Sequence, residues 1–274
     1  MAFFSGSRIN TNVGALNAFN ALNSINSKMG TVQMRLASGK RINSAADDPA
    51  GYTLGKKLDV RARSMSQALN NVGELKNILS VAEGGLQSIS DIYAGIKEKA
   101  IQAGNGSYGD DELSAIVTEV QDMLGEVDDI ISETKFNSNA LLNNQFTGKS
   151  FQVGADTGDT LSVSISKDID SADFGLNSLT TANVGSMLSS LDSAIQTVSQ
   201  ELQNVGSLMS RLDVKEQNLS VSITNTEAAR SRIMDADIAK EQLEITKMQI
   251  LQQTATAQLA QANSAPQGVL SLFR

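Results

Sequence analysis

The sequence of 274 residues contains no histidine, no cysteine and no tryptophan, and it has only two prolines and three tyrosines. Without histidine there is no imidazole acid–base catalysis, and without cysteine there is no thiol nucleophile and no disulfide. Zinc sites built on these two residue types are excluded for the same reason. The absence of cysteine fits a reducing compartment or an exterior protein that needs no disulfide. We therefore expect no enzyme, no cofactor and no metal site.

Long apolar runs are missing as well. No stretch of about 18 consecutive apolar residues could span a bilayer, so we expect no membrane insertion. The first residues, MAFFSGSRIN, lack the basic and apolar regions of a cleaved signal peptide. If the protein leaves the cell, we expect a route that needs no such signal.

The charges are distributed unevenly along the chain. Residues 1–63 carry nine Lys and Arg against three Asp, whereas the whole chain has a net charge of −8, so the middle of the chain is strongly acidic. Basic ends can indicate nucleic-acid binding. Here the cations are scattered and no aromatic side chains lie between them for base stacking, so we expect no nucleic-acid partner.

Apolar residues recur at alternating steps of four and three over residues 54–103, and only Arg61 breaks the series. A second series covers residues 113–130. A third covers residues 184–233, with interruptions at Glu216, Thr226 and Arg230. This spacing is typical of long helices in a bundle or coiled coil. We predict a mainly α fold: an elongated antiparallel helical bundle.

The two ends have a different composition. Residues 10–26 contain six asparagines and no charge, with apolar side chains at every third position. Near the other end, apolar residues form a seam on a segment rich in Gln, Thr and Ala. Such helices are marginal alone in water. We expect these N- and C-terminal helices to fold by pairing with each other or with neighbouring molecules.

Strand-like alternation is confined to one stretch. Phe151 and Val153 alternate with polar residues before a Gly/Asp turn, and Leu161, Val163 and Ile165 alternate after it. This pattern predicts a small β-hairpin near residues 150–166.

Two glycine-containing motifs have competing interpretations. GNGSYG at residues 104–109 matches the dinucleotide fingerprint, which needs a preceding strand. Here a long heptad segment precedes it, so we predict a turn between helices, followed by a helix with acidic residues in its first turn. ADTGDT at residues 155–160 offers two aspartates for calcium but lacks the other ligands of an EF-hand. We predict a hairpin turn there.

The segment LASGKRINSAADDPAG at residues 36–51 holds the best candidates for carboxylate chemistry, Asp47 and Asp48. The structural alternative is that Asp48 caps a helix whose first residue is Pro49. Arg41 could pair with either aspartate. We favour capping at a joint between two helices over a catalytic or metal-binding role.

Several motifs together resemble bacterial flagellin. RINTNVGALNAFNALN near the start, RLASGKRINSAADDPAG after the first helix and ETKFNSNALLN before the hairpin are similar to flagellin segments. EAARSRIMDADIAKE and LAQANSAPQGVLSLFR are similar to its C-terminal signature. These motifs occur in the flagellin order over nearly the whole chain.

The resemblance implies a structural subunit of the extracellular flagellar filament for motility, exported unfolded by the type III system. Residues 1–44 and 236–274 would form the terminal-helix core domain, and residues 45–235 a rod-like helical domain with the hairpin and no large outer domain. The implied partners are other copies of the chain, sister flagellins, a chaperone at the C-terminal helix, and the filament cap and hook-junction proteins. The candidate assembly residues are Leu16, Phe19, Leu22, Ile25, Arg41, Asn43, Asp47, Asp48, Ile245, Met248, Leu259 and Ala262.

Departures and alternatives accompany this resemblance. Flagellins sensed by the animal receptor carry an Arg and a Leu where this chain has Gly95 and Lys99; these two departures argue against recognition by that receptor, and the sequence alone does not decide it. The alternatives are a hook–filament junction-type adaptor or another non-polymerising helical coiled-coil protein.

Overall fold

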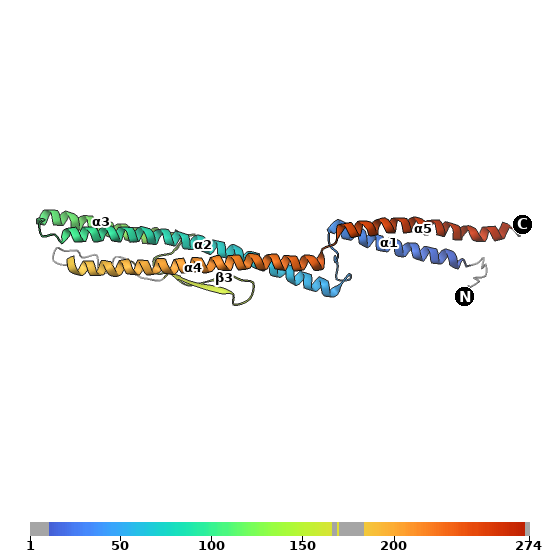
Figure 1. Cartoon of the computed structure of the whole chain (residues 1–274), viewed down its shortest axis with the longest axis horizontal. Coiled ribbons are helices and arrows are strands. Elements are labelled where there is room, and N and C mark those ends of the chain that lie inside the picture. The colour runs from blue at the N-terminus through green and yellow to red at the C-terminus, as the bar shows by residue number, and fades with distance from the viewer. Residues whose placement is uncertain (1–10, 166–168, 170–183, 272–274) are drawn as a thin grey trace. The chain divides into compact units, whose positions relative to one another are not determined.

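The computed structural model describes residues 11–165, residue 169 and residues 184–271. Helices dominate these ranges (Figure 1), which confirms the predicted mainly α class. The helices are α1 (Val13–Ser38), α2 (Pro49–Ala103), α3 (Asp110–Glu133), α4 (Val184–Met234) and α5 (Ile238–Ser271). The strands are β1 (Lys135–Phe136), β2 (Asn139–Ala140), β3 (Phe146–Gln152) and β4 (Thr160–Ile165).

The chain divides into two compact units. Unit 1 contains the residues up to Val60 together with those from Asn225 onward, and unit 2 contains Arg61–Thr224. Helices α2 and α4 therefore contribute to both units. The domain boundaries suggested by the resemblance, after residue 44 and before residue 236, concern layers of an assembly and stay a prediction.

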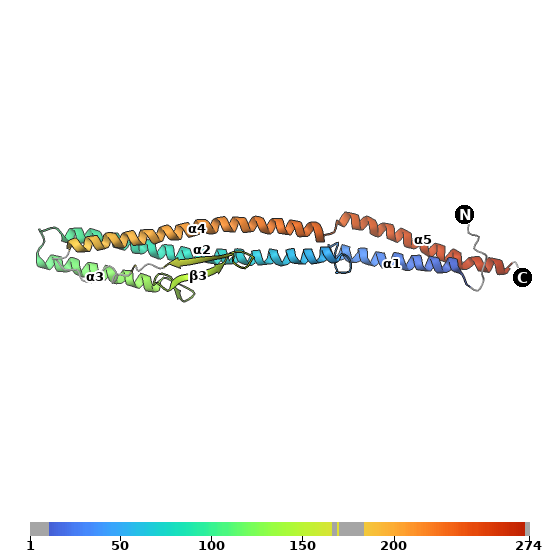
Figure 2. The ribbon, with the colours of Figure 1, turned by 90° about the horizontal axis from the view of Figure 1, so that it is seen from below.

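Unit 2 is a helical bundle in which α3 and α4 run antiparallel to α2 (Figures 1 and 2). Ion pairs between α2 and α4 agree with the direction of α4. Lys97 Nζ lies 2.5 Å from Asp192, and nearer the other end of the bundle Lys76 Nζ lies 2.6 Å from Asp213 and 2.8 Å from Glu216. Glu216 interrupts the third apolar series, in α4, because its carboxylate pairs with Lys76 beside the apolar seam.

The core of unit 2 follows the predicted heptad spacing of α2. Val72, Leu75, Leu79, Leu86 and Ile89 are fully buried. At the start of the seam the buried position is Ala62 rather than its neighbour Arg61. Arg61 is exposed, with its guanidinium 3.4 Å from Asp156. The single break in the apolar series is therefore a one-residue shift of the seam.

The β3–β4 hairpin covers one part of this core. It begins at Phe146, a few residues before the predicted start, and β4 ends at Ile165; residue 166 lies outside the described residues. Leu161, Val163 and Ile165 face the core. The turn is closed by the Asp156 N–H, which donates to Asp159 at 3.3 Å, and by Gly158 with φ +106°. This is the predicted turn.

A second, shorter hairpin, β1–β2, was not predicted. Lys135 pairs with Ala140 and Phe136 with Asn139. Its two central residues, Asn137 and Ser138, both have positive φ angles, 47° and 65°, as a tight two-residue hairpin turn requires. Without a glycine at either position, the sequence carries no strong signal for this turn.

GNGSYG forms the turn between α2 and α3, as predicted. The Gly109 N–H donates to Glu112 Oε2 at 2.9 Å, which caps α3. Asp110 and Asp111 occupy the first turn of that helix. No helix in the described ranges is apolar enough over a sufficient length to cross a membrane.

Candidate subunit interface

The joint in unit 1 links α1 to α2, and Asp48 caps the second of these helices. The Gly51 N–H donates to Asp48 Oδ1 at 3.0 Å, and Pro49 is the first residue of α2. Pro at this position loses no helical hydrogen bond. The capping interpretation of Asp48 is confirmed by this geometry.

Asp47 closes the loop that precedes the cap. Its Oδ2 accepts the N–H of Ser44 at 2.9 Å, the N–H of Asn43 at 3.1 Å and the Ser44 hydroxyl at 3.1 Å. The backbone hydrogen bonds from Ser44 and Asn43 lower the pKa of Asp47 from its usual value of 3.8. Both aspartates therefore hold backbone groups of the joint.

Arg41 pairs with neither aspartate, although the sequence left that possibility open. Its guanidinium donates to the Ile233 carbonyl at 2.8 Å, and its N–H donates to the Met234 carbonyl at 2.7 Å. Nearby, the Ala236 N–H donates to the Gly39 carbonyl at 2.9 Å. The carboxylates of Asp47 and Asp48 are engaged by local N–H groups, whereas the end of α4 offers free carbonyls to Arg41. The loop after α1 is thus fastened to the segment between α4 and α5.

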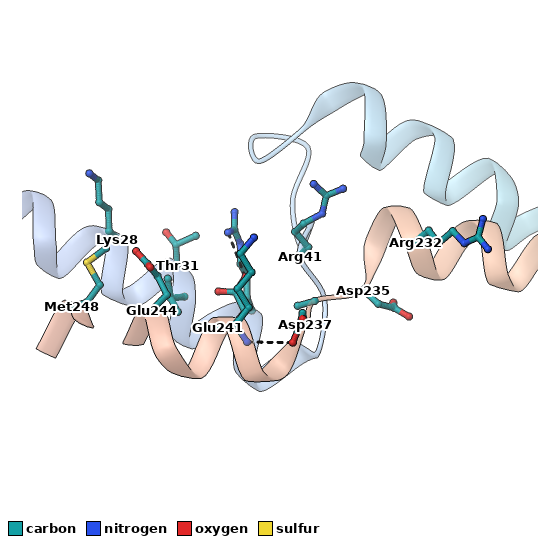
Figure 3. A pocket seen from close by; sticks show the side chains of 13 residues that line it. Lys28, Thr31, Arg41, Arg232, Asp235, Asp237, Glu241, Glu244 and Met248 are labelled. Atoms are coloured by element: carbon teal, nitrogen blue, oxygen red, sulfur yellow. Dashed lines mark hydrogen bonds and ion pairs between the residues drawn. The ribbon is translucent and has the colours of Figure 1, made fainter. Parts of the chain in front are cut away.

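A cleft of about 600 Å³ lies beside this joint (Figure 3). Its lining comes from α1, α5, the loop and the end of α4. Arg35 lies 3.8 Å from Glu241, and its Nε is buried without a hydrogen bond. Further charged lining residues of both signs are Lys28, Arg41, Arg232, Lys240, Asp235, Asp237 and Glu244. No group of metal-ligating side chains large enough to hold an ion occurs in the described ranges.

Helices α1 and α5 form an antiparallel pair (Figures 1 and 2), which confirms the predicted pairing of the terminal helices. Asn12 Nδ2 donates to the Ala262 carbonyl at 2.6 Å, and Gln252 Nε2 donates to Asn26 Oδ1 at 2.8 Å. In this way, asparagines of the uncharged N-terminal segment and a glutamine of α5 bridge the two helices.

The predicted C-terminal seam faces α1. Ile245 and Met248 are buried, and Leu259 and Ala262 are half-buried. Helices α1 and α5 contact each other directly. These four assembly candidates therefore already have a partner within the chain.

The N-terminal candidates do not share one face. Leu22 and Ile25 are half-buried on the side of α5, whereas Leu16 is 55% exposed and Phe19 is 49% exposed. A strict spacing of three residues drifts by about 60° at each step around an α-helix. The series from Val13 to Ile25 therefore winds from the outer side of α1 to the side that contacts α5.

Outer apolar residues of α5 and α1 were missed in the sequence. Leu243 is 73% exposed and Ile250 is 59% exposed. Their spacing of seven places them on one side of α5, and an offset of two residues from Ile245 and Met248, about 200° around the helix, puts that side opposite the buried seam. On α1, Met34 is 60% exposed and lies on the same side as Leu16. The signal for Leu243 and Ile250 is a second heptad series, which the stronger series of Ile245 and Met248 conceals.

Two family models match this chain, and curated proteins resemble it over nearly its full length. The model of the bacterial flagellin N-terminal helical region matches residues 9–147, and that of the C-terminal helical region matches residues 188–273. Flagellin of Bacillus subtilis is 35% identical over 303 residues, covering 97% of this chain and 100% of that protein. Flagellin FlaB1 of Treponema pallidum is 33% identical over 286 residues, covering 97% of this chain and 99% of that protein.

A solved structure shares the fold. A protein described as a flagellar hook-associated protein of Vibrio parahaemolyticus superposes with a TM-score of 0.59, over 69% of this chain and 100% of that one, at 17% identity. At that identity the similarity concerns the fold alone. The two family models, which cover most of both ends, and the near full-length relatives decide the assignment: the chain belongs to the bacterial flagellin family.

Proposed function

We propose that the outer faces of α1 and α5 are the surfaces through which copies of this chain polymerise into the flagellar filament that drives motility. Flagellins are structural proteins that self-assemble and not enzymes. The observation that carries the proposal is the exposure of Leu243, Ile250 and Leu16 on a helix pair whose inner seam is already filled. Copies that pack side by side would remove these side chains from water.

Folding and assembly are coupled in this proposal. The α1–α5 pair buries few large side chains, and helices of this kind gain most of their stability from tertiary packing. Contacts with neighbouring copies would therefore complete the fold. Export of an unfolded chain through the type III apparatus, without a cleaved signal peptide, is compatible with ends that become fully packed only in the polymer.

The assembly candidates then have two roles. Ile245, Met248, Leu22, Ile25, Leu259 and Ala262 join the two helices of one copy, whereas Leu16 and Phe19 contact other copies. At the joint, Asp47 and Asp48 shape the loop, and Arg41 and Asn43 fix its course. Residues 1–44 and 236–274 would form the inner layer of the filament, and residues 45–235 the rod-like layer outside it.

Further partners follow from the same exposed faces. Before export, Leu243 and Ile250 would need cover, and a chaperone bound to the C-terminal helix would supply it. The filament cap, the hook-junction proteins and sister flagellins would meet the chain through the same terminal helices. Lys99, whose Nζ lies 2.6 Å from Glu119, and Gly95 stay the two departures that argue against recognition by the animal receptor.

The proposal is tested by electron microscopy of the purified chain after salting out, with two neighbouring substitutions. Leu243→Ala should leave the unfolding free energy nearly unchanged because the side chain is exposed in the single chain. It should raise the critical concentration for polymerisation by about tenfold to a hundredfold, because burial of a leucine contributes about 1.5–3 kcal/mol.

Ile245→Ala is the matched comparison. It should destabilise the helix pair by about 2–5 kcal/mol even in the single chain, because it empties a buried position. If Leu243→Ala polymerises like the unaltered chain, the outer face of α5 is not an assembly surface. If the unaltered chain forms no filaments alone, the junction-type adaptor becomes the better function; stable dimers without further growth would indicate another coiled-coil protein.

A further inference from the structure

The turn between α2 and α3 contains the single Asn–Gly step of the chain, Asn105–Gly106. Both residues are exposed. The motif that contains them resembles a nucleotide-binding fingerprint, but it follows a helix, so that role does not explain it. An asparagine followed by glycine has a reactivity of its own, because no side chain shields the glycine nitrogen from the asparagine side chain.

The local geometry favours attack of the Gly106 nitrogen on the Asn105 side chain. In the part of the chain that the structure describes, no hydrogen bond engages the Gly106 N–H. Asn105 Oδ1 accepts the Ser107 N–H at 3.4 Å, which turns the side-chain amide toward the following backbone. The same N–H would stabilise negative charge on that oxygen as a tetrahedral intermediate forms.

The backbone of Asn105 is held by hydrogen bonds to residues on both sides of it in the chain. Its N–H donates to the Gln102 carbonyl at 3.1 Å, and its carbonyl accepts the Tyr108 N–H at 3.4 Å. The two reacting groups are neighbours in a closed turn, so little further ordering is needed before reaction. Apart from its two chain neighbours, no residue places an atom within 4 Å of the position that a Gly106 Cβ would occupy, and Gly106 is exposed, so solvent reaches this part of the turn.

We propose that Asn105 is a site of spontaneous deamidation in the folded protein. The Gly106 nitrogen loses its proton and bonds to Asn105 Cγ, the Cγ–Nδ2 bond breaks and ammonia leaves, which gives a five-membered succinimide. Water then adds to one of the two ring carbonyls and the corresponding C–N bond breaks. The product is aspartate or, with the main chain rerouted through the side chain, isoaspartate.

The product changes the charge at one end of unit 2. A new carboxylate appears in the turn, two residues after the end of α2 and five before the start of α3; the first turn of α3 already contains Asp110, Asp111 and Glu112. The isoaspartate form adds a carbon to the main chain of the turn. Older molecules would thus carry aspartate or isoaspartate at position 105, where newly made molecules carry asparagine.

The test is peptide mass spectrometry of the full-length chain kept folded in mildly alkaline buffer over days. The expected result is a mass increase of one unit confined to the peptide that contains Asn105, together with separable aspartate and isoaspartate forms. The matched control is Gly106→Ala. It leaves the turn intact, because the added Cβ meets nothing and the φ angle of Gly106 is not positive. It should slow the reaction by about tenfold, a barrier increase of about 1.4 kcal/mol.

A synthetic peptide of residues 100–112 provides the reference rate. The folded chain should react at least as fast as this peptide, because the turn brings the groups together. A folded chain that stays unmodified while the peptide deamidates would overturn the proposal. An equal rate in the Gly106→Ala chain would also overturn it, because the Gly106 nitrogen would then not be the controlling group.

Discussion

At the scale of single residues, the joint in unit 1 depends on two adjacent aspartates that accept backbone N–H groups. Asp48 caps α2 through the Gly51 N–H at 3.0 Å. We predict that Asp48→Ala lowers the unfolding free energy by about 1 kcal/mol, because one N–H of the first turn loses its acceptor. Asp48→Asn keeps an acceptor oxygen and should lose much less. Urea denaturation followed by circular dichroism measures both, and equal losses would contradict the capping role.

Asp47 gives the joint a pH dependence. Because the N–H groups of Ser44 and Asn43 hold the pKa of Asp47 below 3.8, the ionised carboxylate stabilises the folded loop above that value. This contribution is lost as the pH falls through the lowered pKa. We predict that the Ser44 and Asn43 amides exchange faster with solvent in acid, as NMR would detect. In Asp47→Asn the exchange rates of these two amides should no longer rise in acid. If they still rise, a titratable group other than Asp47 causes the pH dependence.

At the scale of helices, the sequence predicts the elements well and their faces less well. The heptad series locates α2, α3 and α4 because each buries a regular stripe. The series of α1 fails to define one face, since steps of three wind around the helix and leave Leu16 on the outside. The second stripe of α5, Leu243 and Ile250, was hidden because charged and polar residues flank it and the buried series of Ile245 and Met248 runs beside it. The partners of Arg41 could not be predicted because they are backbone carbonyls of a distant segment, which leave no signal in the sequence.

Close packing between helices gives a prediction at the same scale. A Cβ on Gly55 of α2 would lie 2.6 Å from Met234 Cγ at the end of α4. We predict that Gly55→Ala destabilises unit 1 by about 1–3 kcal/mol through overpacking. Gly73→Ala, in the same helix with open space around the added carbon, should instead stabilise by about 0.5–1 kcal/mol. Thermal unfolding of the two variants measures both changes in stability. A Gly55→Ala chain that is more stable than the unaltered one would show that the joint is not tightly packed there.

At the scale of the whole molecule, the two units differ in charge. The sequence of unit 2 holds 22 Asp and Glu against 10 Lys and Arg, a net charge of −12, and α3 contains nine carboxylates without one cation. Copies of unit 2 brought together in a polymer would therefore repel each other, and salt would screen this repulsion over about 10 Å at 0.1 M. We predict that polymerisation, followed by light scattering, becomes faster as sodium chloride rises. Slower growth would mean that attraction between opposite charges dominates the interface.

The central claim is that copies of this chain polymerise through the outer faces of α1 and α5. A cryo-electron microscopy reconstruction of the polymer grown from the purified chain tests it most directly. The account predicts a tubular filament in which Leu16, Leu243 and Ile250 lie against neighbouring copies while Ile245 and Met248 stay between α1 and α5 of one copy. A filament in which the three outer residues remain in solvent would contradict the account.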